Sequence, residues 1–168
     1  MFPYLLLVLA PLPLVLGQLA TPIEPVSELC LGCICEAASN CNRTLQCNGD
    51  VCGIFRITWA YWADANKPTL DLDNASDPGA YARCVNEPKC AANTVVSYMN
   101  RFAQDCNMDG VVNCWDYAAI HHLGGYGCQG QLDYPYYTKF ANCQQWVQSQ
   151  LSQSSGRGIT SDQFELFA

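Results

Sequence analysis

Basic residues are scarce in this chain. Its 168 residues include 8 Lys and Arg against 15 Asp and Glu, a formal net charge of −7 at neutral pH. The few basic residues form no cluster in the sequence, which argues against nucleic acid as a partner, because nucleic-acid-binding proteins carry a basic patch or stripe. The acidic balance also removes the long-range attraction that a basic protein has for anionic bacterial surfaces.

Long apolar runs are missing after residue 17. Residues 1–17, MFPYLLLVLAPLPLVLG, are apolar and contain no Lys or Arg. The run is shorter than the roughly 20 apolar residues that a membrane span needs, and Pro11 and Pro13 interrupt it. It therefore predicts a signal peptide over residues 1–17, removed on export, with residues 18–29 as an extended leader. We expect a secreted, extracellular protein with no membrane partner.

A second Cys-x-x-Cys pair, which a zinc site built on Cys30 and Cys33 would need, is absent. In an exported chain, the even count of twelve cysteines predicts up to six disulfides, whose pairing the sequence does not give. Zinc is the alternative that the ligand-like spacing of Cys30 and Cys33 leaves open. Two glycosylation sequons, at Asn42 and Asn74, agree with export. The cysteines are Cys30, Cys33, Cys35, Cys41, Cys47, Cys52, Cys84, Cys90, Cys106, Cys114, Cys128 and Cys143.

Apolar periodicity predicts a mainly helical chain without internal repeats. Residues 53–65 begin like a strand and end as an aromatic, helix-like piece, and residues 66–83 contain the Pro and Gly residues of a loop. The expected fold class is α+β, with a helical body and a small β region. Residues 144–168 are expected to hold the end of the last helix and a mobile polar tail. Helices are predicted over residues 30–41, 90–106, 114–123 and 136–151.

Residues 105–116, DCNMDGVVNCWD, match the oxygen-ligand pattern of a calcium loop. Gly110 would permit the sharp bend, and calcium there would be structural, with no open coordination position for chemistry. The alternative is a polar turn whose aspartate caps the next helix. No other cofactor is predicted. The candidate ligands are Asp105, Asn107, Asp109, the Val111 carbonyl, Asn113 and Asp116.

Four stretches of the sequence carry a family resemblance. CLGCICEAASNC, CGIFRITWAYWADANKPT, YARCVNEPKCAANTVVSYMNRFAQDC and YAAIHHLGGYGC resemble the motifs of invertebrate-type (i-type) lysozymes, the destabilase family, over residues 30–143. The resemblance implies a compact, disulfide-rich, lysozyme-like fold with a glycan cleft. Active members cleave the β-1,4 bond between N-acetylmuramic acid and N-acetylglucosamine. The expected partner is therefore bacterial peptidoglycan or another glycan containing N-acetylglucosamine.

The resemblance also shows which catalytic residue is missing. Active members use a Glu as general acid and an Asp on the opposite wall. The acid stands three residues after the third cysteine of the opening motif, which is Ala38 here. Glu36 lies two residues earlier, about 200° around a helix, and should face away from the cleft. Because a methyl group cannot donate a proton, about 10²- to 10⁴-fold of rate should be lost.

The remaining family positions are less decisive. The Asp of active members corresponds to Asp50, between Cys47 and Cys52, although this loop is shorter here and an ordinary turn aspartate is an equal alternative. Arg56 and Thr58 occupy the positions of the Ser and Lys to which isopeptidase activity is assigned, so no nucleophile–base pair is expected.

Aromatic residues are the predicted contacts for sugar rings. The candidates are Trp59, Tyr61, Trp62 and His122, and packing in the core is the alternative for the aromatic ones. We expect an i-type lysozyme family protein that is inactive or weakly active as a muramidase. The alternatives are a glycan-binding or defence-related module without hydrolysis, and a stable extracellular protein with a non-glycan partner.

Overall fold

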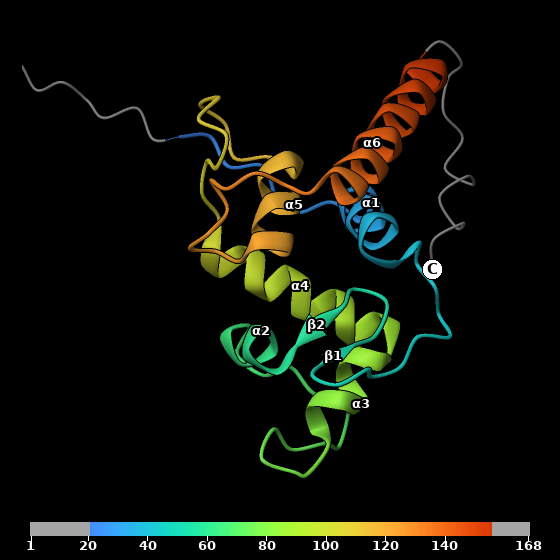
Figure 1. Ribbon diagram of the computed structural model, residues 1–168, viewed down its shortest axis with the longest axis vertical. Coiled ribbons are helices and arrows are strands. Elements are labelled where there is room, and N and C mark those ends of the chain that lie inside the picture. Colours follow the sequence, from blue (N-terminus) through green and yellow to red (C-terminus); the bar gives the residue numbers. More distant parts are fainter. Residues whose placement is uncertain (1–20, 156–168) are drawn as a thin grey trace, which may run out of the picture.

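The computed structural model describes residues 21–155, and Figure 1 shows a mainly helical chain with one short hairpin. The expected α+β class is confirmed. The predicted signal peptide over residues 1–17 and the tail from residue 156 onward lie outside the described residues. In chain order the elements are α1 Glu28–Ser39, β1 Val51–Cys52, β2 Ile57–Thr58, α2 Trp59–Asp64, α3 Ala80–Asn86, α4 Pro88–Phe102, α5 Cys114–Leu123 and α6 Tyr134–Ser155.

Helix α1 forms where the cysteine-rich segment predicted a helix. The Ser27 hydroxyl accepts a hydrogen bond from the Cys30 N–H at 3.1 Å, and Glu28 in the first turn complements the helix dipole. Asn40 ends the helix in the left-handed region at φ 54°, which asparagine tolerates better than most residues. Before α1, residues 21–27 are extended, and Ile23 pairs with Val112 in a single β-bridge. Residues 28 and 29 of the predicted leader already belong to α1.

The strand-then-helix prediction for residues 53–65 is confirmed in part, because residues 53–56 form a turn, Ile57–Thr58 a strand and Trp59–Asp64 a helix. Strands β1 and β2 are antiparallel, with Cys52 opposite Ile57. Gly53 opens the turn between them at φ 71°, and a Cβ there would lie 1.9 Å from the Val85 carbonyl oxygen, so only glycine fits. The Thr58 hydroxyl then accepts from the Tyr61 N–H at 3.2 Å and starts α2.

The later helices follow the predictions with three differences. The predicted loop over residues 66–83 ends early, because α3 begins at Ala80. Helix α4 begins two residues before the predicted range, with Pro88 in its first turn, and ends at Phe102. Helix α6 runs to Ser155, so residues 152–155 are helical and are not part of a mobile tail. The bounds of α5 agree with the prediction.

All twelve cysteines are paired, and the zinc alternative is therefore wrong. The bonds from Cys30 and Cys33 connect α1 to α5 and α6, while the others close shorter stretches of chain. The pairs are Cys30–Cys114, Cys33–Cys143, Cys35–Cys41, Cys47–Cys52, Cys84–Cys90 and Cys106–Cys128.

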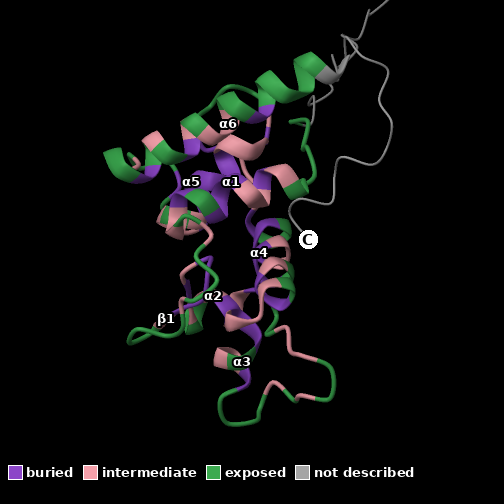
Figure 2. Cartoon of the chain, turned by 90° about the vertical axis from the view of Figure 1, so that its right-hand side faces the viewer, coloured by how far each residue is buried: buried purple, intermediate pink, exposed green. Residues whose placement is uncertain are grey.

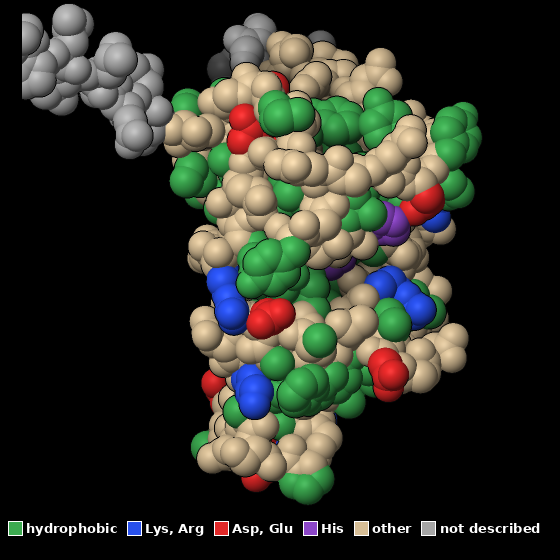
Figure 3. Space-filling model, turned by 60° about the vertical axis from the view of Figure 1, so that its left-hand side comes forward, with side chains coloured by type: hydrophobic (Ala, Val, Ile, Leu, Met, Phe, Trp, Pro, Cys, Tyr) green, Lys and Arg blue, Asp and Glu red, His purple; other side chains and the backbone are tan. Residues whose placement is uncertain are grey.

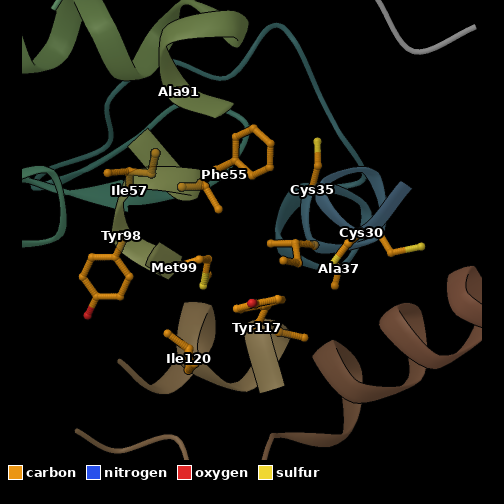
Figure 4. Close-up of a cluster of buried hydrophobic side chains, with 14 of the residues drawn as sticks. Cys30, Cys35, Ala37, Phe55, Ile57, Ala91, Tyr98, Met99, Tyr117 and Ile120 are labelled. Atoms are coloured by element: carbon orange, nitrogen blue, oxygen red, sulfur yellow. The ribbon is translucent and has the colours of Figure 1, made fainter. Parts of the chain in front are cut away.

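The core lies where helices from different parts of the chain meet. Figures 1 and 2 show α1, α5 and α6 gathered at one end, α4 running through the middle, and the hairpin with α2 and α3 at the other end. Figure 4 shows the buried cluster between them, where Phe55 from the hairpin turn lies with Met99 of α4 and Ile120 of α5. Among residues 21–155, no helix combines the length and apolar character that a bilayer crossing requires.

Candidate functional site

A hollow of about 360 Å³ opens beside Ala38. Its walls come from α1, the hairpin turn, the end of α5 and the first turns of α6. Figure 3 shows the two histidine side chains (purple) recessed on this face, with acidic (red) and basic (blue) side chains near them. We call this cavity the Ala38 hollow, and it is lined by Ala37, Ala38, Phe55, Arg56, His121, His122, Asp133, Pro135, Tyr136 and Lys139.

Glu36 lies in a different cavity, on the side of α1 that faces α6. This second cavity, of about 480 Å³, is lined mainly by apolar groups and includes the exposed ring of Trp146. We call it the Glu36 groove. Glu36 is not part of the Ala38 hollow, as the helical rotation between the two positions predicted. The groove is lined by Glu28, Leu29, Gly32, Cys33, Glu36, Cys41, Lys139, Asn142, Cys143, Trp146 and Val147.

His121 lies in the Ala38 hollow as a neutral, fixed side chain. Its Nε2 lies 2.9 Å from the Phe55 carbonyl oxygen, which can only accept, so Nε2 carries the proton. The Tyr61 hydroxyl then donates to Nδ1 at 3.1 Å. Burial lowers the pKa of His121 to about 4, which the hydrogen bond to Phe55 only partly offsets. Both ring nitrogens are engaged, which leaves His121 neither free nor charged for acid–base work at neutral pH.

Asp133 and His122 form a second pair in the hollow, and the sequence analysis did not identify Asp133. Its Oδ2 lies 2.5 Å from His122 Nε2, and its Oδ1 accepts from the Tyr136 N–H at 3.0 Å. The His122 ring stacks on Tyr136 at a centroid distance of 4.0 Å. An Asp just before a predicted helix with an early Pro135 is a capping signal that could have identified Asp133, but its proximity to His122 is tertiary.

The charge state of Asp133 matters because it is the one carboxylic acid that lines the hollow among residues 21–155. The Tyr136 N–H hydrogen bond, and then the hydrogen bond and charge of His122, lower the pKa of this carboxyl group. It is therefore ionised at neutral pH. A general acid must be protonated before the reaction, so Asp133 is not suited to that role.

Asp50 is not brought into the Ala38 hollow. It lies exposed in the turn before β1, and its backbone carbonyl accepts from the Tyr81 hydroxyl at 3.0 Å. The pKa of Tyr81 is raised to about 12, by burial first and then by the negative charge of Asp50. Ala38 lines the hollow and Asp50 is not among its lining residues.

The predicted sugar-contacting aromatics separate into buried and exposed groups. Trp62 is 2% exposed and donates its Nε1–H to the Pro68 carbonyl at 2.6 Å, so it belongs to the core and offers no free ring face. Tyr61 stacks on Tyr98 at 3.7 Å and orients His121. Trp59 is 54% exposed, with Lys67 near its ring. Of the predicted set, His122 is the residue that lines the Ala38 hollow.

The structure does not support calcium binding by residues 105–116. Asp116 is fully buried and accepts from the Cys106 and Asn113 N–H groups, each at 2.8 Å, so both of its oxygens face backbone donors. Asn113 and Asp116 form a reciprocal capping box at the start of α5. The capping alternative is therefore the one observed.

The other predicted calcium ligands form hydrogen bonds within the same turn. Asp105 accepts from the Gly110 N–H at 2.9 Å, and Asp109 accepts from the Val111 N–H at 2.9 Å. Asn107 Oδ1 accepts from the Asp109 N–H at 3.0 Å. Within residues 21–155, no three His, Cys, Asp or Glu side chains are grouped to hold a metal ion. The residues present therefore do not fit a calcium site.

Both sequon asparagines lie on the surface. Asn42 is exposed, and its Oδ1 accepts from the Thr44 hydroxyl at 2.8 Å. Asn74 is exposed in the loop before α3, and its Oδ1 accepts from the Ser76 N–H at 2.9 Å. Their modification stays a prediction.

Comparison with known proteins assigns the fold to a family. The model of the Destabilase family matches residues 27–143. The chain belongs to the destabilase family of invertebrate-type lysozymes. It is 35% identical to a lysozyme of Magallana gigas over 118 residues, which is 68% of this chain and 77% of that protein. It is 32% identical to invertebrate-type lysozyme 3 of Caenorhabditis elegans over 129 residues, covering 74% and 91% of the two chains.

Solved structures of destabilase-family lysozymes share the fold. Meretrix lusoria lysozyme in complex with Aeromonas hydrophila PliI matches with a TM-score of 0.54 and 28% identity, covering 70% of this chain and 90% of that one. Tapes japonica lysozyme matches with a TM-score of 0.50 and 28% identity, covering 70% and 88%.

Proposed function

We propose that this destabilase-family chain is a secreted protein that binds glycan in the Ala38 hollow and hydrolyses it weakly or not at all. The observation that supports the proposal is Ala38 itself, which lines the hollow at the position where the family resemblance expects the general acid. The relatives are named lysozymes, so peptidoglycan or another glycan containing N-acetylglucosamine is the ligand we propose.

A weak muramidase is the second candidate, with Asp50 as one carboxylate and a borrowed acid as the other. The acid would have to be a protonated group in the Ala38 hollow. Asp133 lines the hollow, but its lowered pKa keeps it ionised. Asp50 is not among the residues that line the hollow. Both observations favour the binding function over the enzyme.

The decisive measurement is the clearing of a bacterial cell-wall suspension by the purified, oxidised protein. At equal concentration, we expect clearing to be at least about 10²-fold slower than with an active family member, because the general acid is missing. Clearing at a comparable rate would overturn the proposal. Binding of N-acetylglucosamine oligomers without cleavage would support the glycan-binding module.

Ala38→Glu tests whether the cleft is otherwise preserved. The new carboxyl group would stand beside Phe55 and His121, at the position where the family resemblance expects the general acid. We expect this variant to clear walls faster than the parent protein. Ala60→Glu, on the exposed side of α2, adds the same charge away from the hollow and should not change clearing. Equal rates for both variants would mean that the second carboxylate is also lost.

A further inference from the structure

Two cations line the Ala38 hollow without a partner. Arg56 comes from the hairpin turn and Lys139 from α6. Among the described residues, neither the guanidinium of Arg56 nor the ammonium of Lys139 forms a hydrogen bond or an ion pair, and the three ion pairs involve Arg83, Arg101 and His122 instead. The chain has only 8 Lys and Arg in total, so two unpaired cations around one hollow are a local excess of positive charge.

The acidic groups near these cations cancel only part of that excess. The ionised Asp133 offsets one of the two positive charges, so the lining side chains keep a net charge of +1 with the histidines counted as neutral. Glu36 shares the Glu36 groove with Lys139, yet the two side chains form no ion pair. Ala38 places a methyl group where active relatives would have a carboxyl group. The change that removes the proton donor therefore also removes a negative charge that would repel an anion.

The backbone conformation of Arg56 is a separate observation about this residue. Its φ is 54°, in the left-handed region that glycine and asparagine occupy at lower cost than arginine. The turn is fixed by a hydrogen bond from the Arg56 N–H to the Gly53 carbonyl at 3.1 Å. Of the seven described non-glycine residues with a positive φ, Arg56 is the one that lines the Ala38 hollow, and a strained residue at a cavity suggests a functional role for its side chain.

We propose that the Ala38 hollow binds the carboxylate of an acidic sugar through Arg56 and Lys139. The planar guanidinium can donate two parallel hydrogen bonds to a carboxylate, and the ammonium adds a point charge from the opposite element. The volume of about 360 Å³ is in the range of small-ligand sites. This inference rests on the proposed glycan-binding function and specifies the class of ligand.

The carboxylate could come from the lactyl group of a muramyl sugar or from a uronic acid. Calorimetric titration of the oxidised full chain with three probes separates these sources: a muramyl disaccharide, a glucuronate-containing disaccharide and a neutral N-acetylglucosamine disaccharide. We expect at least one acidic probe to bind about tenfold or more tightly than the neutral one, because charge-assisted hydrogen bonds are the stronger kind. Neutral binding that is equal or tighter, or no binding of any probe, overturns the proposal.

Variants attribute the preference to the two cations. Arg56→Asn fits the left-handed backbone and removes the charge, and Lys139→Gln keeps the helix and removes the charge. Each should weaken binding of the acidic probe about tenfold and leave the neutral probe unchanged. Lys89→Gln, an exposed lysine on α4, is the matched control and should have no effect. Unchanged affinity in both hollow variants would refute the role of the cations.

Two further readouts keep the outcomes distinct. The melting temperature of Arg56→Asn should equal or exceed that of the parent, which excludes misfolding as the cause of weaker binding. The wall-clearing assay tests the proposed function separately. If the protein clears cell walls and also binds acidic sugars through Arg56, the proposal of weak or absent hydrolysis is wrong, and the proposal of a carboxylate site at Arg56 and Lys139 still holds.

Discussion

The cavities on the two sides of helix α1 differ in chemistry, although Glu36 and Ala38, which line one cavity each, are only two positions apart in the sequence. The Ala38 hollow combines side chains from α1, the hairpin turn, α5 and α6, and it is polar, with two cations that form no ion pair within residues 21–155. The Glu36 groove lies between α1 and α6, has a carboxylate, and is lined mainly by apolar groups. Glu36 is two residues from the family's acid position in the sequence, but the two side chains line different cavities.

The difference indicates that the lysozyme-like fold does not depend on a carboxyl group at position 38. The hollow depends on packing among four elements, and that packing involves the backbone, the disulfides and His121 rather than the side chain at position 38. Substitutions that disturb the shared framework should damage both sides of α1, and substitutions confined to one side should leave the other unchanged.

The largest effect is expected from breaking the disulfide that holds the wall common to both cavities. Cys33–Cys143 joins α1 to α6 across a separation of 110 residues. Replacing both cysteines with alanine should lower the free energy of unfolding by about 5 kcal/mol, because the unfolded chain gains the entropy of a long loop. Denaturation in urea measures the change.

Cys47–Cys52 is the comparison for that disulfide. It spans only 5 residues and lies by Asp50, away from the two cavities. The same replacement should cost only about 2 kcal/mol, since a short loop is less costly to close. Equal losses in free energy of unfolding for the two double variants would contradict the expectation that the long-range disulfide between α1 and α6 contributes more to stability.

Gly53→Ala is expected to have the next largest effect. The added Cβ would lie 1.9 Å from the backbone carbonyl of Val85, which cannot move as a side chain could, and φ is positive. We expect a loss of about 3 kcal/mol and a displaced hairpin turn at the Ala38 hollow. Gly49→Ala, also at positive φ but in open space, should cost only about 1 kcal/mol. Thermal unfolding of both variants measures the two losses of stability. Similar losses would mean that the backbone at Val85 moves to remove the clash.

His121 should make the stability of the Ala38 side depend on pH. Its pKa in the folded protein is about 4, below the ordinary value near 6.5 that the unfolded chain has. The stabilisation is therefore complete above about pH 6.5 and is lost as the pH falls toward 4. At pH 4.5 the parent should have lost about 2 kcal/mol from this group relative to pH 8.

His121→Gln isolates this contribution, because the amide can hydrogen-bond but does not titrate. Urea denaturation at pH 8 measures the constant cost of the substitution, and the same measurement at pH 4.5 should show a smaller gap to the parent. A gap that does not change with pH would indicate that His121 titrates normally in the folded state.

The sequence predicted the elements that local signals specify. Helix α5 matched because Asn113 and Asp116 mark its start and Gly124 its end. The same two residues also produced the wrong calcium prediction, since oxygen side chains at alternate positions serve either a metal or a capped turn. The start of α3 was missed because Pro78 and Gly79 immediately precede it.

The site was harder to predict than the fold because its members come from distant segments. Ala38 and the orientation of Glu36 followed from helical geometry, which is local. The contact of Asp133 with His122, and of Arg56 with the same hollow, depends on how α5, α6 and the hairpin pack. Trp62 was predicted to contact sugar, yet its Nε1–H is satisfied by Pro68 inside the core. No pattern along the chain distinguishes these outcomes.

The smallest expected effect is also the most direct test of the two-sided description. In an Ala38→Glu background, a further Glu36→Gln change should leave the rate of wall clearing unchanged, because residue 36 faces the Glu36 groove and not the hollow. Folding should also change little, since Glu36 is exposed and forms no ion pair within the described chain. A clear fall in clearing rate would mean that the carboxylate of Glu36 reaches the sugar from the other side of α1, and the separation of the two cavities would then not describe the protein in solution.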